Sequence, residues 1–197
     1  IDSAIFGDEL ELTTIGGGKA IGICGSGIVD IVAGMLEKGI IDETGRIASG
    51  SEAKSLPKGY AERLKEIDGV KSFLLYDSDE CEAGMDIAIT QKDIRELQNA
   101  KAAIAAGIKT LAKHAGIRLE DVEKVYLAGG FGNYINIESA LTIGLLPREL
   151  KGRVEAVGNS AGAGASAGLL SYEFLQEADK VKNRIRYIEL SANADFV

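Results

Sequence analysis

The first forty residues alternate between short apolar runs and glycine turns. Residues 9–14 place leucines between polar neighbours, and this two-residue period predicts a β-strand. A second apolar run, Lys19–Cys24, follows a three-glycine turn and is typical of another short strand. Apolar residues then recur every three or four positions across residues 28–38, which predicts a helix that ends at Gly39.

The next segment changes character twice. Residues 48–70 are polar and weakly periodic, which predicts a loop with a short helix around Tyr60–Ile67. The apolar segments Ser72–Tyr76 and Met85–Ile89 then flank an acidic stretch that ends in glycine. This arrangement predicts a β-hairpin.

The strongest helical pattern begins after Thr90 and runs to about Ala115. Thr90 is a favourable N-cap, and Asp93 three residues later completes a capping-box pattern. Apolar residues form one stripe along this helix, and Lys101 interrupts it. Two interpretations remain open. The lysine stem packs on the core while its ammonium reaches solvent, or the ammonium faces an anionic ligand.

In the last third of the chain, strands and helices alternate. We predict strands at Val125–Ala128, Val154–Val157 and Arg184–Leu190, and helices at Ile137–Ile143 and Ala161–Gln176. Strands come first in the chain and then alternate with helices, without an obvious linker, which favours one α/β domain.

Three units share one plan, in which a strand is followed by a glycine turn and a helix. Ligands of open α/β sheets bind beyond the carboxyl ends of the strands, and turns without side chains let backbone N–H groups approach a phosphate. The alternative is that the glycines only permit tight turns. Under the first interpretation the candidate nucleotide contacts are Gly25, Ser26, Gly27, Lys101, Gly129, Gly130, Phe131, Gly132, Asn133, Gly158, Asn159 and Ser160.

Sequence motifs for several other chemistries are incomplete. The pair Gly18-Lys19 is followed by Ala20 where a Walker loop needs serine or threonine. No G-x-G-x-x-G follows a predicted strand, which argues against a Rossmann site. Residues 158–162 match G-x-S-x-G, but a hydrolase of that type needs a histidine after the serine, and the single histidine is His114. We therefore assign no catalytic residue.

Composition and net charge argue against several further classes of function and site. The chain has 22 basic and 30 acidic residues, a net charge of −8 and no basic stripe, which argues against nucleic-acid binding. No apolar run is long enough to span a membrane. Two cysteines and one histidine do not supply a zinc site or a four-cysteine iron–sulfur cluster. The sparse cysteines fit a reducing cytosol, so we expect a cytoplasmic location. Because the first residue is not Met, we expect a piece of a longer protein.

Long segments of the chain resemble one protein family. They are AIGICGSGIVD at Ala20–Asp30, ITQKDIRELQNAKAAI at Ile89–Ile104 and VYLAGGFGNYI at Val125–Ile135, continued by Ser139–Leu141 and Ile143–Pro147. These segments are similar to the carboxy-terminal domain of the reductive activators of corrinoid-dependent enzymes. That domain belongs to the superfamily of acetate and sugar kinases, heat-shock chaperone ATPases and actin, and the resemblance covers nearly the whole chain.

The resemblance implies an α/β fold, a ribonuclease-H-like, actin-like ATPase lobe with a mixed sheet and flanking helices. Residues 1–197 would then form a single domain, the second lobe, with the first lobe and an iron–sulfur domain outside this chain. Leu127–Gly130 resembles the adenosine motif of the superfamily, and Val157–Ala167 resembles the small-residue helix that follows it. Gly25–Asp30 resembles the turn and helix start after the second phosphate hairpin.

The family returns the cobalt of a corrinoid protein from inactive Co(II) to Co(I), an uphill electron transfer that ATP drives. The resemblance therefore implies ATP and Mg²⁺ as cofactors and an iron–sulfur cluster only in the remainder of the longer protein. The implied partner is the corrinoid protein of a methyltransferase system, and a homodimer is an assembly to test. We assign no metal ligand in this chain and expect it to be inactive when isolated.

Two other function classes stay open at this point. The same fold hosts small-molecule kinases, and a third class is a non-catalytic interaction module that has lost nucleotide binding. A ferredoxin-like cysteine cluster upstream in the full-length sequence would favour the activator over the kinase.

Overall fold

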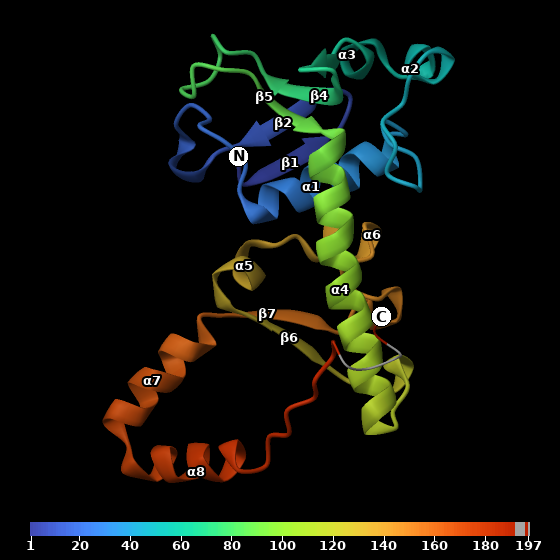
Figure 1. Ribbon diagram of the computed structural model, residues 1–197. Helices are drawn as coiled ribbons and strands as arrows, with labels where there is room; N and C mark the ends of the chain where they lie inside the picture. Colours follow the sequence, from blue (N-terminus) through green and yellow to red (C-terminus); the bar gives the residue numbers. More distant parts are fainter. Residues whose placement is uncertain (192–195, 197) are drawn as a thin grey trace. The chain divides into compact units, whose positions relative to one another are not determined.

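The computed structural model describes residues 1–191 and residue 196 (Figure 1). Chain contacts divide it into two compact units. Unit 1 comprises Ile1–Ile104 and Ile135–Arg148, and unit 2 comprises Ala105–Tyr134 and the chain from Glu149 onward. Helix α4 (Gln91–Ala115) contributes residues to both units.

The strands form three sheets among the described residues. Unit 1 contains an antiparallel pair, β1 (Ser3–Phe6) and β2 (Leu10–Thr13), and an antiparallel sheet of β3 (Leu64–Ile67), β4 (Val70–Tyr76) and β5 (Ile87–Thr90). Unit 2 contains a parallel pair, β6 (Val125–Ala128) and β7 (Val154–Gly158). The antiparallel and parallel pairings expected within one mixed sheet are thus distributed over separate sheets.

The helices of unit 1 are α1 (Gly25–Glu37), α2 (Ser51–Ser55), α3 (Lys58–Ala61), the first part of α4 and α6 (Ile137–Thr142). Those of unit 2 are the rest of α4, α5 (Gly129–Tyr134), α7 (Ser160–Leu170) and α8 (Tyr172–Lys182). Short 3-10 turns occur at Ile15–Gly17, Leu119–Asp121 and Arg148–Leu150.

The core of unit 1 forms where α1 lies directly on β1. Gly34 of α1 faces the Phe6 ring so closely that a side chain at this position would overlap the ring. Phe6 stacks in turn on Tyr60 and Phe73, with ring centroids 5.6 Å and 6.0 Å away. The Tyr60 hydroxyl donates a hydrogen bond of 3.0 Å to the carbonyl of Gly7, so α3 and the first hairpin are held together.

Helix α4 follows the predicted boundaries and capping. The Thr90 N–H donates to Asp93 Oδ2 at 2.9 Å, and the Asp93 N–H donates to Thr90 Oγ1 at 3.2 Å, which confirms the capping box. The β-hairpin predicted just before this helix is also confirmed as β4 and β5.

Several predicted elements are wrong, each for a local reason. The helix expected over Tyr60–Ile67 ends early, because Asp68 and Gly69 adopt positive φ values of 51° and 73° and turn β3 back onto β4. The helix expected over Ala161–Gln176 is two helices, since Ser171 is extended and its hydroxyl caps α8. No strand forms over Arg184–Leu190.

The strand predicted over Lys19–Cys24 is also absent as a regular element. Its backbone is instead hydrogen-bonded to Ile1 and Glu82. Among the described residues, no helix is both long enough and apolar enough to cross a lipid bilayer.

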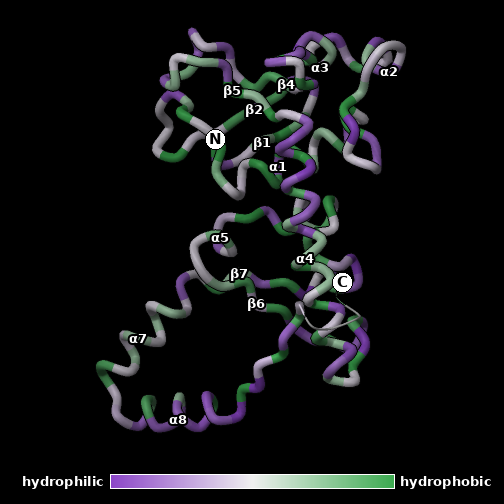
Figure 2. Tube along the Cα trace, in the orientation of Figure 1, coloured by the Kyte–Doolittle hydropathy of each residue, from purple (hydrophilic) through white to green (hydrophobic). Residues whose placement is uncertain are grey.

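Helices α7 and α8 are highly exposed in unit 2, and neither contains a buried residue. Figure 2 shows pale and green colours along α7 and largely purple ones along α8, in line with the absence of charged residues from α7. Leu169, Leu170 and Tyr172, at the junction of the two helices, are 89%, 88% and 75% exposed. The apolar surface of this junction is therefore open.

Asp30 is a carboxylate in the interior of unit 1. It is 5% exposed, and its Oδ1 has no hydrogen-bond partner among the described residues. Burial raises the pKa of Asp30 above its usual range, a repulsion from Asp2 adds to this, and hydrogen bonds from Ser139 and the Ala4 backbone oppose it. The folded state therefore holds the proton of Asp30 more tightly than the unfolded chain does.

Because this pKa is raised, the stabilising contribution of Asp30 is fully present below its unfolded pKa of about 3.9 and is lost as pH rises through the folded value. We expect Asp30→Asn to remove this loss, so that the melting temperature falls less between pH 4 and pH 8 than in the unsubstituted chain. Thermal unfolding, followed by circular dichroism across this pH range, measures the change in melting temperature.

The matched control is Asp42→Asn on the surface. A hydrogen bond from the Thr44 hydroxyl and one from the Arg46 backbone lower the pKa of Asp42, so its contribution is present above its unfolded pKa and is lost as pH falls. Between pH 4 and pH 8, Asp42→Asn should therefore leave the pH dependence of the melting temperature almost unchanged, because the contribution of Asp42 is lost only below its unfolded pKa of about 3.9. Identical profiles for Asp30→Asn and the unsubstituted chain would contradict the assignment.

Candidate functional site

Two of the predicted glycine turns meet at the carboxyl ends of the parallel strands in unit 2. Ala128, the last residue of β6, is the register partner of Gly158, the last residue of β7. Asn133 of α5 lies close by, with its Oδ1 3.7 Å from where a Gly158 Cβ would be. The structure thus brings Gly129–Asn133 and Gly158–Ser160 together at the sheet edge where ligands of α/β folds bind.

The glycines of this site serve different purposes. Gly129 and Gly158 have φ values of 89° and 65°, which glycine adopts without strain, and they turn the chain from strand to helix. Gly132 packs on β6, because a Cβ here would lie 3.1 Å from the carbonyl carbon of Leu127. A Cβ at Gly130 would meet no atom within 4 Å. The absence of a side chain at Gly130 therefore leaves open space, as it does at Gly129, and Gly130 has no positive φ that a substitution would strain.

Helix α7 begins at the same edge. The side chain of Asn159 is its N-cap, since its Oδ1 accepts a hydrogen bond of 2.9 Å from the Gly162 N–H. The helix start directs backbone N–H groups and a partial positive charge outward, which suits a phosphate. Phe131 is 50% exposed and offers an aromatic face. None of the residues in the two turns ionises near neutral pH, so the site is equipped to bind a ligand and supplies no acid or base.

Gly25, Ser26 and Gly27 belong to unit 1 and start α1. A Cβ on Gly27 would overlap the carbonyl oxygen of Ile1, and the Ser26 hydroxyl donates to the carbonyl of Asp2 at 2.9 Å. Both residues are buried against the beginning of the chain. These contacts account for the small residues by packing, and a nucleotide role for the three stays a prediction.

Cys24 precedes this turn and is half-buried, as the N-cap residue of α1. Its Sγ lies 3.1 Å from the Ser26 hydroxyl. Burial alone would raise the pKa of Cys24, but hydrogen bonding with the Ser26 side chain and with the Gly27 and Ser26 backbone outweighs it, and the pKa is lowered. The described residues form no group of three or more His, Cys, Asp or Glu that could hold a metal.

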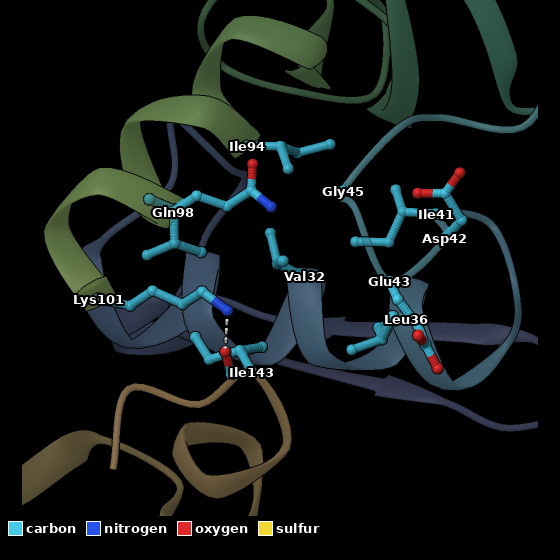
Figure 3. Close-up of a pocket in the computed structure, with 11 residues that line it drawn as sticks. Val32, Leu36, Ile41, Asp42, Glu43, Gly45, Ile94, Gln98, Lys101 and Ile143 are labelled. Atoms are coloured by element: carbon cyan, nitrogen blue, oxygen red, sulfur yellow. Dashed lines mark hydrogen bonds between the residues drawn. The ribbon is translucent and has the colours of Figure 1, made fainter. Parts of the chain in front are cut away.

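Lys101 lies in unit 1 on α4, at a small cavity of about 30 Å³ (Figure 3). Its Nζ donates a hydrogen bond to the carbonyl of Ile143, the C-cap residue of α6. Asp42, Glu43 and Gln98 also line the cavity. A lysine at a helix C-terminus complements the helix dipole, so the structure gives Lys101 a partner that the sequence did not indicate. Its contact with an anionic ligand stays a prediction.

Comparison with known proteins identifies the family. The sequence profile of the C-terminal domain of RACo, the ASKHA domain, matches residues 2–197. The chain belongs to this family. It therefore has the actin-like ATPase fold, of mixed α/β class, that the resemblance implied.

Two curated relatives support the assignment. The chain is 36% identical over 189 residues to the corrinoid activation enzyme RamQ of Eubacterium limosum, covering 96% of this chain and 32% of RamQ. It is 28% identical over 169 residues to the [Co(II) methylated amine-specific corrinoid protein] reductase of Methanosarcina barkeri, covering 86% of this chain and 26% of that protein.

A solved structure agrees with them. The reductive activator for corrinoid, iron-sulfur protein superposes with a TM-score of 0.81 at 38% identity, over 95% of this chain and 29% of that one. The chain thus spans about a quarter to a third of the length of the relatives that it matches.

Leu127 was predicted only as part of the stretch that resembles the adenosine motif, and the structure shows that Gly132 packs on it. Asn159 was selected as a ligand contact, and the structure shows that its side chain also caps α7.

Substitutions of Gly130 and Gly132 should show which of these two glycines is needed for packing. We expect Gly132→Ala to destabilise the chain by about 1–3 kcal/mol, because the new methyl group overpacks against β6. We expect Gly130→Ala to change stability little, since its methyl group meets open space. Chemical denaturation of both variants measures the difference, and equal losses would contradict the packing described for Gly132.

Lys101→Met removes the hydrogen bond to Ile143 while keeping the length of the side chain. The variant should lose about 1–3 kcal/mol of stability, since a partly buried carbonyl then lacks a donor. Lys101→Arg, which keeps a donor and the positive charge, is the control and should lose less. An unchanged melting temperature for Lys101→Met would indicate that the ammonium is directed elsewhere.

Proposed function

We propose that the longer protein is an ATP-dependent reductive activator of a corrinoid protein and that this domain supplies part of its nucleotide site. The observation that carries the proposal is the meeting of Gly129–Asn133 and Gly158–Ser160 at the ends of two parallel strands. The family membership supports it, because the relatives are named as activators or reductases of corrinoid proteins.

The residues of the site fit a nucleotide. The open space at Gly130 would admit an adenosine close to the backbone, and the exposed ring of Phe131 would lie against an apolar part of it. The N–H groups at the start of α7 would donate to phosphate oxygens, with Asn159 holding that turn in place. ATP and Mg²⁺, when bound, would supply the free energy that an uphill reduction of Co(II) to Co(I) requires.

The chain's own contribution is positioning rather than bond making. The two turns hold the ligand through backbone groups, and no side chain within them can abstract or deliver a proton. We assign the iron–sulfur cluster and the groups that place water and metal to the part of the longer protein outside this chain. The corrinoid protein, which holds the cobalt, is the proposed substrate partner.

The test uses the full-length protein, its corrinoid partner in the Co(II) state, and a low-potential reductant. The formation of Co(I), followed by its absorbance, should depend on ATP. Gly130→Val should lower ATP affinity at least about tenfold in calorimetric titration, a loss of about 1.4 kcal/mol, because the branched side chain fills the open space.

The control is the melting temperature of Gly130→Val, which should change little because a Cβ at this position meets no atom within 4 Å. ATP affinity equal to that of the unsubstituted protein would refute the placement of the nucleotide. Co(I) formation at the same rate without ATP would refute the function itself.

The isolated 197-residue chain should hydrolyse ATP no faster than a buffer control, because it provides no acid, base or phosphate-loop carboxylate at the turns. A phosphate-release assay with Mg²⁺ and ATP measures this. Turnover at kinase-like rates, roughly 1–100 per second, would show that a complete catalytic apparatus lies within this chain.

A further inference from the structure

Strand β2 is paired on one edge only. It pairs with β1, and no other strand among the described residues lies beside it. The backbone groups on its outer edge are therefore not part of any ladder. An unpaired edge is a template on which another segment can form one more strand.

Two hollows follow the outer edge of β2. The first, of about 450 Å³, is lined by Glu9 and Leu10 at the beginning of the strand, and the second, of about 520 Å³, by Leu12 and Thr13 at its end. No described residue of β1 lines either hollow, and Glu80 lines both. The two hollows thus form one trough along β2, on the side away from β1.

The opposite wall of the trough is the end of β4. Leu74 lines the first hollow and Tyr76 the second, beyond the last register pair of β3 with β4, Leu64 and Phe73. The backbone of Leu74 already has partners, because its N–H donates to the Arg63 carbonyl and its carbonyl accepts a hydrogen bond of 3.1 Å from the Arg63 guanidinium. The backbone that lacks a partner strand is therefore that of β2.

The trough is acidic at the end where β2 begins. Four carboxylates from separate segments line the first hollow: Glu9, Glu62, Asp77 and Glu80. The two cations there are engaged, since Lys65 pairs with Asp77 at 3.2 Å and Arg63 donates to backbone carbonyls. Glu9 and Glu80 form no ion pair with any residue that the structure describes. In the second hollow, the charge of Lys19 balances that of Glu80.

The charge of the whole unit has the same sign. Unit 1 contains 20 acidic and 12 basic residues and thus carries the entire net charge of −8, whereas unit 2 contains 10 of each. The field of unit 1 and the unpaired carboxylates of the trough therefore both attract a positively charged segment.

We propose that an extended basic segment of a partner protein binds in this trough as an additional strand on β2. Hydrogen bonds to the outer edge of β2 hold its main chain, and lysine or arginine side chains pair with Glu9 and Glu80. Side chains alternate along a strand, so the residues between them are apolar and lie beside Leu10 and Leu12. Since four residues of β2 span about 13 Å, a segment of about six residues covers the trough.

A synthetic peptide of six residues, alternating valine and lysine with blocked ends, is the probe. Titrated calorimetrically into the full-length protein at low ionic strength, it should bind saturably. The same peptide with glutamate in place of lysine should bind at least about tenfold more weakly. Absence of binding by the lysine peptide, or equal binding of the two, would overturn the proposal.

Backbone methylation separates strand pairing from attraction between charges. One version of the peptide is N-methylated at every valine and another at every lysine, so that all side chains and charges are kept. A strand directs the N–H groups of alternate residues to its neighbour, so one version should lose at least about tenfold in affinity and the other should bind like the parent. Equal affinities of both versions would refute the added strand.

Charge reversal in the protein locates the peptide. Glu80→Lys, at the residue that both hollows share, should lower the affinity for the lysine peptide at least about tenfold. The matched control is Glu96→Lys on α4, which changes the net charge equally at an exposed residue that lines neither hollow, and it should bind within about twofold of the unsubstituted protein. Equal losses in the two variants would show that the peptide follows net charge alone.

Amide hydrogen exchange identifies the edge that is used. With the lysine peptide bound, outward-facing amides of β2 should exchange at least about tenfold more slowly than in the free full-length protein. Protection of these amides without any peptide would assign the edge to another part of the longer protein and would end the proposal. None of these measurements involves a nucleotide, so they are independent of the proposed function.

Discussion

Both units depend on glycines that let a helix approach its neighbours more closely than any side chain would allow. In unit 1, Gly34 receives the Phe6 ring of β1 and Gly27 receives the carbonyl of Ile1, so both glycines let α1 lie close to the start of the chain. In unit 2, Gly132 places α5 against Leu127 of β6 in the same way. A methyl group at Gly27 or Gly34 would overlap the neighbouring atoms, and one at Gly132 would crowd the backbone of Leu127, so the packing around Phe6 and at the end of β6 would have to shift.

Elements with strong local signals could be predicted from the sequence. The capping box at Thr90 and Asp93 fixed the start of α4, and the apolar runs of β4 and β5 predicted their hairpin. Elements that depend on the backbone conformation of one or two residues could not be predicted from the sequence. The turn at Asp68 and Gly69 converts an expected helix into a strand, and no periodicity shows this because four residues are too few to define a period.

The candidate site shows a second kind of feature that the sequence alone does not predict. Each of the three glycine turns lies between a predicted strand and a predicted helix, so the sequence predicted one role for them all. The structure separates Gly130, which faces open space, from Gly27 and Gly132, whose missing side chains are needed for packing. Sequence cannot make this distinction, because it depends on which distant residue lies opposite each glycine. Lys101 is a similar case, since its partner Ile143 is 42 positions away.

The open junction of α7 and α8 determines how the domain behaves as a colloid when it is separated from the rest of its protein. An exposed apolar patch is formed by Leu169, Leu170 and Tyr172 on a molecule of net charge −8. Apolar attraction between two molecules at short range therefore competes with the repulsion of their net charges at long range. At about 0.15 M salt the screening length falls to about 8 Å, and the repulsion no longer keeps these patches apart. Dilute solutions of low ionic strength are therefore the medium in which the separated domain remains dispersed.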